Sequence, residues 1–209
     1  PAADLVGVVD SFSSFRWRRK YYEPGEMELH CNITTNAINT LKPGRLIQIN
    51  GQSDAAIIEA VELQEGGDLA VTGRMLSCCL DWCVIDSEYN YYNTAYADII
   101  RNLVAAHGTG NHLNPLLTLG DTLTTDTVTT QISHRDLLPT VEKLARACEV
   151  GYRVQLDAAS KKWIFDLYQG VDRTVAQKAG IAIFSDIYND IGNTKYTYDE
   201  TEYRNVAIV

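Results

Sequence analysis

The chain has 209 residues, 45% of them hydrophobic and 22% charged, which is typical of a folded protein with one large or two small domains. Its formal net charge of −9 argues against a nucleic-acid-binding surface, because such a surface needs a basic electrostatic field. The five cysteines are an odd number and favour a reducing compartment over a disulfide framework, and no apolar run approaches the roughly 20 residues that span a membrane.

The first predicted elements are a short strand over residues 5 to 12 and a long β-hairpin over residues 15 to 33. Apolar and polar residues alternate with period two along both arms of the hairpin, as in strands with one buried face. Between the arms, Glu23-Pro24-Gly25-Glu26 predicts a type II turn, because proline pre-sets φ at the second position and glycine accepts a positive φ at the third. The residues predicted to face inward are Phe15, Trp17, Tyr21, Met27, Leu29, Cys31 and Ile33.

Further strands are predicted over residues 46–49, 56–64 and 69–75. Residues 35 to 40 read as a polar connection, and turns are expected at Pro43-Gly44, Asn50-Gly51 and Gly66-Gly67-Asp68. We expect sequential neighbours to pair and the sheet to close, because closure removes exposed strand edges. Residues 1 to 90 are therefore predicted to form an antiparallel β-barrel-like domain, which ends in a polar, tyrosine-rich linker over residues 87 to 93.

Residues 91 to 200 are predicted to form an α+β domain of two helices and a β-hairpin. The first helix starts after Thr94, whose hydroxyl suits an N-terminal cap, and stops at Gly108. A long loop is expected over residues 109 to 131. The apolar stripe of the helix consists of Tyr96, Ile99, Ile100, Leu103 and Val104.

The second helix is predicted to begin near Asp136, because Pro139 is tolerated only in a first turn, and to end at Gly151. Its hairpin follows, and later strands are predicted over residues 195–198 and 203–209. The last stretch, residues 201 to 209, would return to the first barrel or start a further C-terminal domain, so we expect the chain to be a piece of a longer protein. The predicted fold class is α+β. The two arms of the hairpin are residues 152–156 and 163–168.

Three cysteines close in sequence, Cys78, Cys79 and Cys83, are followed by His107 and His112. A zinc site would need two ligand pairs at fixed spacing, whereas the cysteines supply one pair without a partner. Cysteine is also a small apolar residue that is often simply buried. We therefore favour a structural role in the core for this cluster.

No sequence motif for acyl transfer, metalloprotease, P-loop or dinucleotide chemistry is present. Cys148 and His134 are the nearest candidates for a nucleophilic pair, but Cys148 falls on the apolar stripe of the predicted helix, where a thiolate is disfavoured. The stretch 133–136 matches a capping box, and the acidic pairs are more often solvated surface than glycosidase carboxylates. We assign no catalytic, cofactor-binding or metal-binding residue, expect no cofactor and predict that the chain is not an enzyme. The acidic pairs are Asp86/Glu88 and Asp186/Asp190.

Two further clusters allow more than one interpretation. The basic residues of segment 16–20, interleaved with aromatic ones, suit a platform for single-stranded nucleic acid, but the solvated face of a strand accounts for the same alternation. The tyrosines of segment 89–96 suit either stacking on a sugar or packing between the two halves or against a partner. The residues concerned are Arg16, Arg18, Arg19 and Lys20 in the first cluster and Tyr89, Tyr91, Tyr92 and Tyr96 in the second.

An ordered series of short stretches resembles the siphophage "gp-thirty-seven-like" tail protein family, whose members look related to the tail-hub and baseplate proteins of phages. The resemblance covers nearly the whole length, apart from residues 109–130. Relatives continue beyond the equivalent of Val209, usually into further β structure. The stretches are Glu23-Pro24-Gly25, Leu41-Lys42-Pro43-Gly44-Arg45, Ile57-Ile58-Glu59, residues 69–76, Gly151-Tyr152-Arg153-Val154, residues 170–174 and Tyr203-x-Asn205-Val206.

The resemblance implies a structural virion component of a phage or prophage tail: barrel-like domains joined by an α+β insertion, assembled as a trimeric or hexameric ring with other tail or baseplate proteins. It implies assembly in the bacterial cytoplasm, no membrane and no specific nucleic acid. An acidic ring would let DNA pass without binding, because like charges repel. Two alternatives stay open: a tail-associated cell-wall hydrolase and a carbohydrate-binding module for the host surface.

Overall fold

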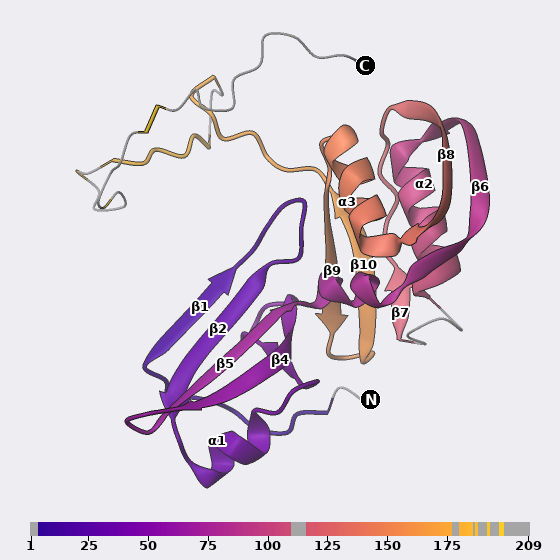
Figure 1. Cartoon of the computed structure of the whole chain (residues 1–209). Coiled ribbons are helices and arrows are strands. Elements are labelled where there is room, and N and C mark those ends of the chain that lie inside the picture. Colours follow the sequence, from indigo (N-terminus) through magenta and orange to yellow (C-terminus); the bar gives the residue numbers. More distant parts are fainter. Residues whose placement is uncertain are drawn as a thin grey trace. The chain divides into compact units, whose positions relative to one another are not determined.

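The computed structural model describes residues 4–109, 116–176, 180–185, 187, 192 and 197–198. The chain forms two units, Pro1–Gly170 and Val171–Val209, and each is described by itself. The first unit contains a five-stranded sheet and a second module of helices, a three-stranded sheet and a two-stranded ribbon (Figure 1). The chain is thus a mixed α and β fold, as the sequence predicts; the predicted boundaries at residues 90 and 200 stay predictions.

The five-stranded sheet is an antiparallel half-barrel with the strand order β1-β2-β5-β4-β3 (Figure 1). The order differs from the predicted pairing of sequential neighbours, because β2 pairs with β5 and β3 lies at the far side of β4. In the described residues the sheet is curled but not closed. Its strands are β1 (Ser14–Arg18), β2 (Glu26–Asn32), β3 (Leu46–Gln48), β4 (Ala55–Gln64) and β5 (Asp68–Met75).

The inner face of the half-barrel buries one small hydrophobic core. Period-two alternation is confirmed in β2, where Met27, Leu29 and Cys31 are buried and their neighbours are not. Helix α1 (Thr35–Thr40) covers this core with Ala37, although the sequence predicts only a polar connection there. Its N-terminus is capped locally, since the Thr34 hydroxyl accepts the N–H of Ala37 at 3.0 Å.

Strand β4 contributes to two cores at once. Its alternate residues Ala56 and Ile58 face the inner core, whereas Ala55 and Ile57 belong to the larger core of the second module. The half-barrel and the second module are therefore joined by a shared strand as well as by the chain between β5 and the module.

Two predictions for the N-terminal region are wrong. Residues 5 to 12 form no strand, and Leu5, Val6 and Val8 are exposed. The link between β1 and β2 is not a type II turn, because Gly25 has no positive φ. Glycine is needed there for space: a Cβ would lie 2.1 Å from the carbonyl oxygen of Arg18.

The second module starts with the 3₁₀ helix η1 (Leu76–Trp82) and packs most of the buried side chains of the chain into one core. A three-stranded sheet with the order β7-β10-β9 and the ribbon β6–β8 enclose α2 and α3 (Figure 1). The elements are β6 (Val84–Ala95), α2 (Tyr96–Leu103), the π-helix η2 (Val104–Gly108), β7 (Leu117–Leu119), β8 (Thr127–Asp136), α3 (Leu137–Ala147), β9 (Gly151–Asp157) and β10 (Lys162–Tyr168).

The ribbon is the largest departure from the sequence-based expectation. The stretch expected to be a linker, residues 87–93, lies within β6, and the expected loop over 109–131 contains β7 and the start of β8. Two register shifts interrupt the pairing of β6 with β8. Asn93 and His134 have positive φ values of 48° and 45° in the ribbon, as bulged positions allow. These interruptions mask the period-two pattern in the sequence.

The caps of helix α2 also differ from the prediction. Thr94 lies in β6 and its hydroxyl donates to the carbonyl of Tyr92, so it does not cap the helix. Thr125 instead accepts the N–H of Ala97 at 3.0 Å, and the carbonyl of Asp126 accepts the N–H of Tyr96. Gly108 ends the π-helix η2 rather than the α-helix, without a positive φ.

The second half of the module follows the prediction closely. Helix α3 begins directly after Asp136 and carries Pro139 in its first turn, and β9 and β10 form the predicted hairpin. The stretch 133–136 belongs to β8 and supplies no side-chain cap, so the predicted capping box is wrong. The left-handed residue after the helix is Glu149, with a φ of 57°, and Gly151 starts β9.

The described residues of the second unit contain no strand, and the predicted strand over 203–209 and most of that over 195–198 lie outside them. The N–H of Ala182 donates to the carbonyl of Arg173 at 3.0 Å, and Gly180 has a positive φ of 73°. None of the helices in the described part of the chain is long and apolar enough to cross a membrane.

Candidate functional site

The two cysteines of η1 and the cysteine that directly follows this helix are part of the hydrophobic core. Cys78, Cys79 and Cys83 are all at most 4% exposed. Burial raises the pKa of the Cys78 thiol to about 12 and that of Cys83 to about 11, and it raises the pKa of Cys79 further still. Neutral thiols of this kind act as small apolar side chains, which agrees with the structural role favoured from the sequence.

The other reactive residues are spread over the second module. Cys148 is half-buried at the end of α3, where its thiol lies 3.2 Å from the carbonyl of Leu144, and burial raises its pKa. His134 lies on β8 in an exposed position. Among the described residues, no group of three or more His, Cys, Asp or Glu side chains could hold a metal ion. His112, Asp186 and Asp190 lie outside the described residues.

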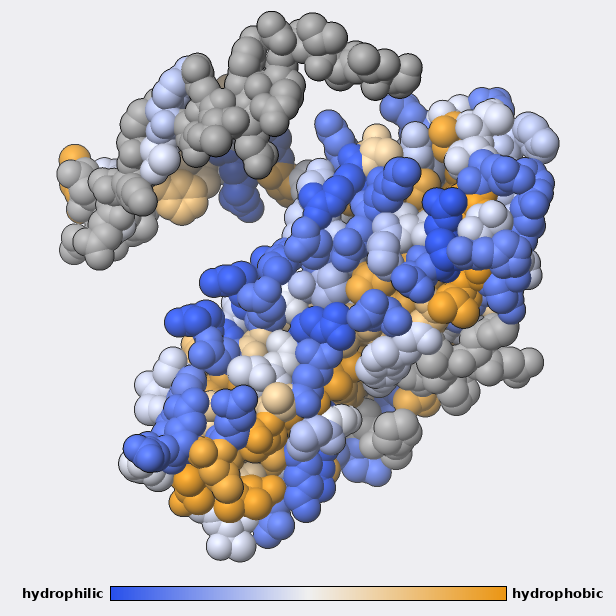
Figure 2. Space-filling view, viewed as in Figure 1, coloured by the Kyte–Doolittle hydropathy of each residue, from blue (hydrophilic) through white to orange (hydrophobic). Residues whose placement is uncertain are grey.

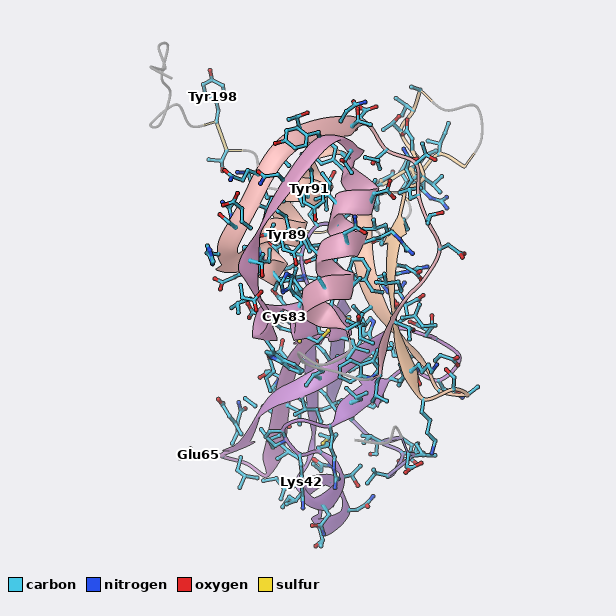
Figure 3. All side chains as sticks on the ribbon, turned by 90° about the vertical axis from the view of Figure 1, so that its right-hand side faces the viewer. Lys42, Glu65, Cys83, Tyr89, Tyr91 and Tyr198 are labelled. Atoms are coloured by element: carbon cyan, nitrogen blue, oxygen red, sulfur yellow. The ribbon has the colours of Figure 1, made fainter. Side chains whose placement is uncertain are left out.

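The tyrosines of β6 pack inward rather than form an open platform. Tyr89 and Tyr91 stack at 6.2 Å between ring centroids and contact the core of the second module (Figure 3). Tyr96 also contacts this core, whereas Tyr92 is 75% exposed. Three of the four rings that suited sugar stacking are therefore used in packing, which was the other interpretation of this cluster.

In the sequence, His107 was considered only as a possible zinc ligand, and the structure gives it another role. It is 3% exposed in the π-helix η2, and its Nε2 lies 3.0 Å from the hydroxyl of Tyr89. The rings meet edge to face at 5.5 Å, and Asp86 lies 3.7 Å from Nδ1. These contacts hold β6 against η2. A histidine that follows a tyrosine-rich strand is the sequence feature that could have indicated this contact.

The basic cluster lies on the outer face of the half-barrel and is paired with carboxylates. Arg16 bridges Glu28 at 2.7 Å and Arg18 bridges Glu26 at 3.1 Å, both directly across from β1 to β2. These cross-strand pairs match the interpretation of the cluster as the solvated face of a strand. A platform for single-stranded nucleic acid would instead need basic side chains that are not already neutralised.

His30 extends this charged face to β5. Its Nδ1 lies 2.6 Å from Asp68 and its Nε2 lies 3.2 Å from Glu28. These two carboxylates raise the pKa of His30, with the hydrogen bond to Asp68 as the larger cause. The charged side chains of this face therefore extend across β1, β2 and β5, and its basic side chains lie beside carboxylates.

The segment between β1 and β2 fastens the half-barrel to the second module. The Tyr21 hydroxyl accepts the N–H of Gly170 at 2.7 Å and lies 3.2 Å from the carbonyl oxygen of Glu149. Its ring meets that of Tyr168 edge to face at 5.3 Å. Arg146 lies over the ring of Tyr22, with 5.0 Å to its centroid.

A cavity of about 180 Å³ lies at this junction. Its cationic side chains are already paired, since Arg19 bridges Asp54 at 2.7 Å and Lys20 bridges Glu26 at 2.6 Å. These ion pairs lie within the half-barrel, and they neutralise the positive charge of Arg19 and Lys20 beside the cavity.

Strand edges and exposed apolar residues of the half-barrel are among the described features without an internal role. Figure 2 shows apolar side chains exposed over the end of the five-stranded sheet near α1, surrounded by hydrophilic ones. Ile33, Ile38 and Leu63 are 37%, 43% and 66% exposed in this region. Exposed apolar groups at a sheet edge are typical of a contact surface for another protein chain.

Comparison with protein families identifies the chain. The family described as "Siphovirus ReqiPepy6 Gp37-like protein" matches residues 1–209, the whole sequence. The chain belongs to this family. The family is one of siphovirus proteins, and it is the family that the resemblance in the sequence indicates. The comparison with curated proteins gave no match.

Solved structures with a similar fold are also tail proteins or related secretion components. The Gp37-like chain is 12% identical to the tail protein from Neisseria meningitidis MC58, with a TM-score of 0.44, covering 70% of this chain and 43% of that one. It is 12% identical to the E. coli c3393 protein, a component of the type VI secretion system, with a TM-score of 0.47, covering 81% of this chain and 48% of that one. It is 10% identical to prophage tail protein gp18 from Listeria monocytogenes EGD-e, with a TM-score of 0.45, covering 76% of this chain and 46% of that one. The chain spans less than half of each of these structures.

Proposed function

We propose that this Gp37-like chain is a structural subunit of a tail hub or baseplate, and that it forms a homo-oligomeric ring, trimeric or hexameric, at the tip of the tail. Its partners would be further copies of itself and other tail proteins. The family match over the whole sequence carries this proposal. The chain would act in the virion tail after assembly in the bacterial cytoplasm.

The way the chain uses its reactive side chains supports a structural role. The cysteines of η1 are packed in the core, Tyr89 pairs with His107 in the module, and the basic face of β1 is matched by carboxylates. Each of these groups stabilises the fold. What the half-barrel offers outward is a pair of strand edges, which suits an assembly protein.

The net charge of −9 further suits a ring around a DNA channel. Acidic side chains on the channel wall would repel the phosphate backbone, so that DNA could pass without binding. In this proposal the half-barrel, the α+β module and residues 201–209 keep the roles expected from the sequence, and the last segment returns to the first sheet or begins a further domain.

Purified virions test the proposal directly. Quantitative mass spectrometry of tails should find the chain at three or six copies per particle, and an antibody against it should label the tail tip. Absence from purified particles would overturn the structural role. A zymogram on host cell walls should stay uncleared, whereas clearing by the purified chain would favour the hydrolase.

A further inference from the structure

Among the described residues, the five-stranded sheet has edges without a paired strand at β1, at the outer side of β3 and along part of β4. Strand β1 pairs on one side only, with β2. Strand β4 is covered by β3 at residues 55–57, and Ile58 still bonds to Arg45, but residues 60–64 pair only with β5. Unpaired N–H and C=O groups along a strand are a template for pairing with another chain.

The two edges have matching patterns of side chains. On β1, Phe15 and Trp17 face the inner core, whereas Arg16 on the outer face is 65% exposed at its side chain. On β4, Val61 lies against the inner core, and Leu63 follows it on the same face.

On the outer face, Glu62 of β4 and Arg16 of β1 carry charges of opposite sign. Glu62 is exposed and pairs with no cation among the described residues, whereas Arg16 already bridges Glu28 at 2.7 Å but keeps 65% of its side chain exposed. Each of these two edges therefore has apolar side chains on the inner face of the sheet and a charged side chain on the outer face. The two charges, on Arg16 and Glu62, are opposite in sign.

The directions of the strands also agree. Each neighbouring pair in the order β1-β2-β5-β4 is antiparallel, so β1 and β4 run in opposite directions. Rotation about an axis along the strands leaves their directions unchanged. The β1 strand of a second copy related by such a rotation would therefore meet β4 as an antiparallel neighbour, which is the arrangement already present throughout this sheet.

We propose that β1 of one copy pairs with residues 60–64 of β4 in the next copy, with Arg16 opposite Glu62, Phe15 opposite Leu63 and Trp17 opposite Val61. This inference rests on the proposed ring, and it names the surfaces that form it. Because the two edges differ, the contact is head to tail and repeats around a ring until it closes. The exposed Leu63 would then be covered by an aromatic ring of the neighbouring copy.

A charge exchange on the full chain tests the pairing. Arg16→Glu and Glu62→Arg should each raise the protein concentration at half-association roughly tenfold, because each places like charges opposite each other. The double variant should restore association, since it exchanges the two charges across the same contact. Arg135→Glu, a charge reversal at an exposed position of β8, controls for the added negative charge alone and should leave association unchanged. Light scattering over a concentration series gives the measurement.

Hydrogen exchange supplies the second measurement. Amides of residues 14–18 and 60–64 should gain protection as the protein concentration rises. If the wild type associates and both charge-reversal variants associate equally well, the proposed strand pairing is wrong but the proposed ring is not contradicted. A wild type that stays monomeric at every concentration would overturn the strand pairing, whereas the copy number in purified tails tests the ring. Protection of residues 60–64 that is independent of concentration would show that this chain covers its own edge, and would also overturn the pairing.

Discussion

The backbone N–H of Gly170 donates to the hydroxyl of Tyr21 at 2.7 Å, and this bond joins two residues that are 149 positions apart. The same hydroxyl lies 3.2 Å from the carbonyl of Glu149 and 3.3 Å from that of Tyr168, so its proton has two acceptors. One side chain of the β1–β2 link therefore satisfies backbone groups at the end of α3 and at the end of β10. The half-barrel is fastened to the second module at this point.

Replacing Tyr21 by phenylalanine should destabilise the first unit by about 0.5 to 1.5 kcal/mol, the net value of a typical hydrogen bond, because the exposed Gly170 N–H exchanges its partner for water while the ring contacts remain. The midpoint of urea unfolding should fall accordingly. Tyr92→Phe is the matched control, since Tyr92 is 75% exposed. Equal midpoints for the two variants would contradict the role of the Tyr21 hydroxyl.

Thr125 caps helix α2 from a distant part of the chain, and this gives a second prediction. Thr125→Ala should cost about 1 kcal/mol in the free energy of unfolding, because the N–H of Ala97 loses its acceptor. Thr94→Ala should cost less, although Thr94 lies only two residues before the helix in sequence. Thr124→Ala, at an exposed neighbouring position, is the control. A larger loss for Thr94 than for Thr125, measured by urea unfolding, would show that the local cap matters more.

These two residues show which part of the fold could be predicted from the sequence. Elements whose signals are local were placed correctly, such as the alternation in β2 and the position of Pro139 in the first turn of α3. Thr125 could not be found in this way, because it caps a helix 28 residues earlier in the chain. The strand β6 was missed because bulges interrupt its alternation and its inward residues are tyrosines, which also suit a linker.

The role of Gly25 illustrates the same limit. Its place after proline suggested a turn with positive φ, yet the constraint is the approach of Arg18 and of Met75, which is 50 residues away in the sequence. The strand order is likewise decided by residues far apart in the sequence, because β2 and β5 pair where both bury side chains in the inner core. At the candidate site, the sequence correctly indicated buried cysteines, but it could not indicate which strand edges stay unpaired.

His30 predicts a pH dependence of stability. Asp68 and Glu28 raise its pKa in the folded protein above the ordinary value of about 6.5, so the folded state binds the proton more tightly than the unfolded state. The stabilisation is complete below that ordinary value and is lost as the pH rises through the folded pKa. The melting temperature of the wild type should therefore fall relative to that of His30→Gln between pH 6 and pH 9.

The titration of His30 itself can be followed by NMR. Its ring signals should give a pKa above 6.5, and Asp68→Asn should lower that pKa because it removes the larger of the two causes. An unchanged His30 titration in the Asp68 variant would show that the short contact to Asp68 is not formed in solution.

Thiol reactivity provides the last prediction. Of the five cysteines, Cys148 is partly exposed and the others are buried, with the pKa of each raised by burial. Because the thiolate is the reacting species, a disulfide reagent at pH 8 should modify one thiol of the native chain first. Cys148→Ser should abolish that first phase, whereas Cys31→Ser should leave it unchanged. In urea all five should react, and a fast reaction of Cys78 in the native protein would mean that η1 opens without global unfolding.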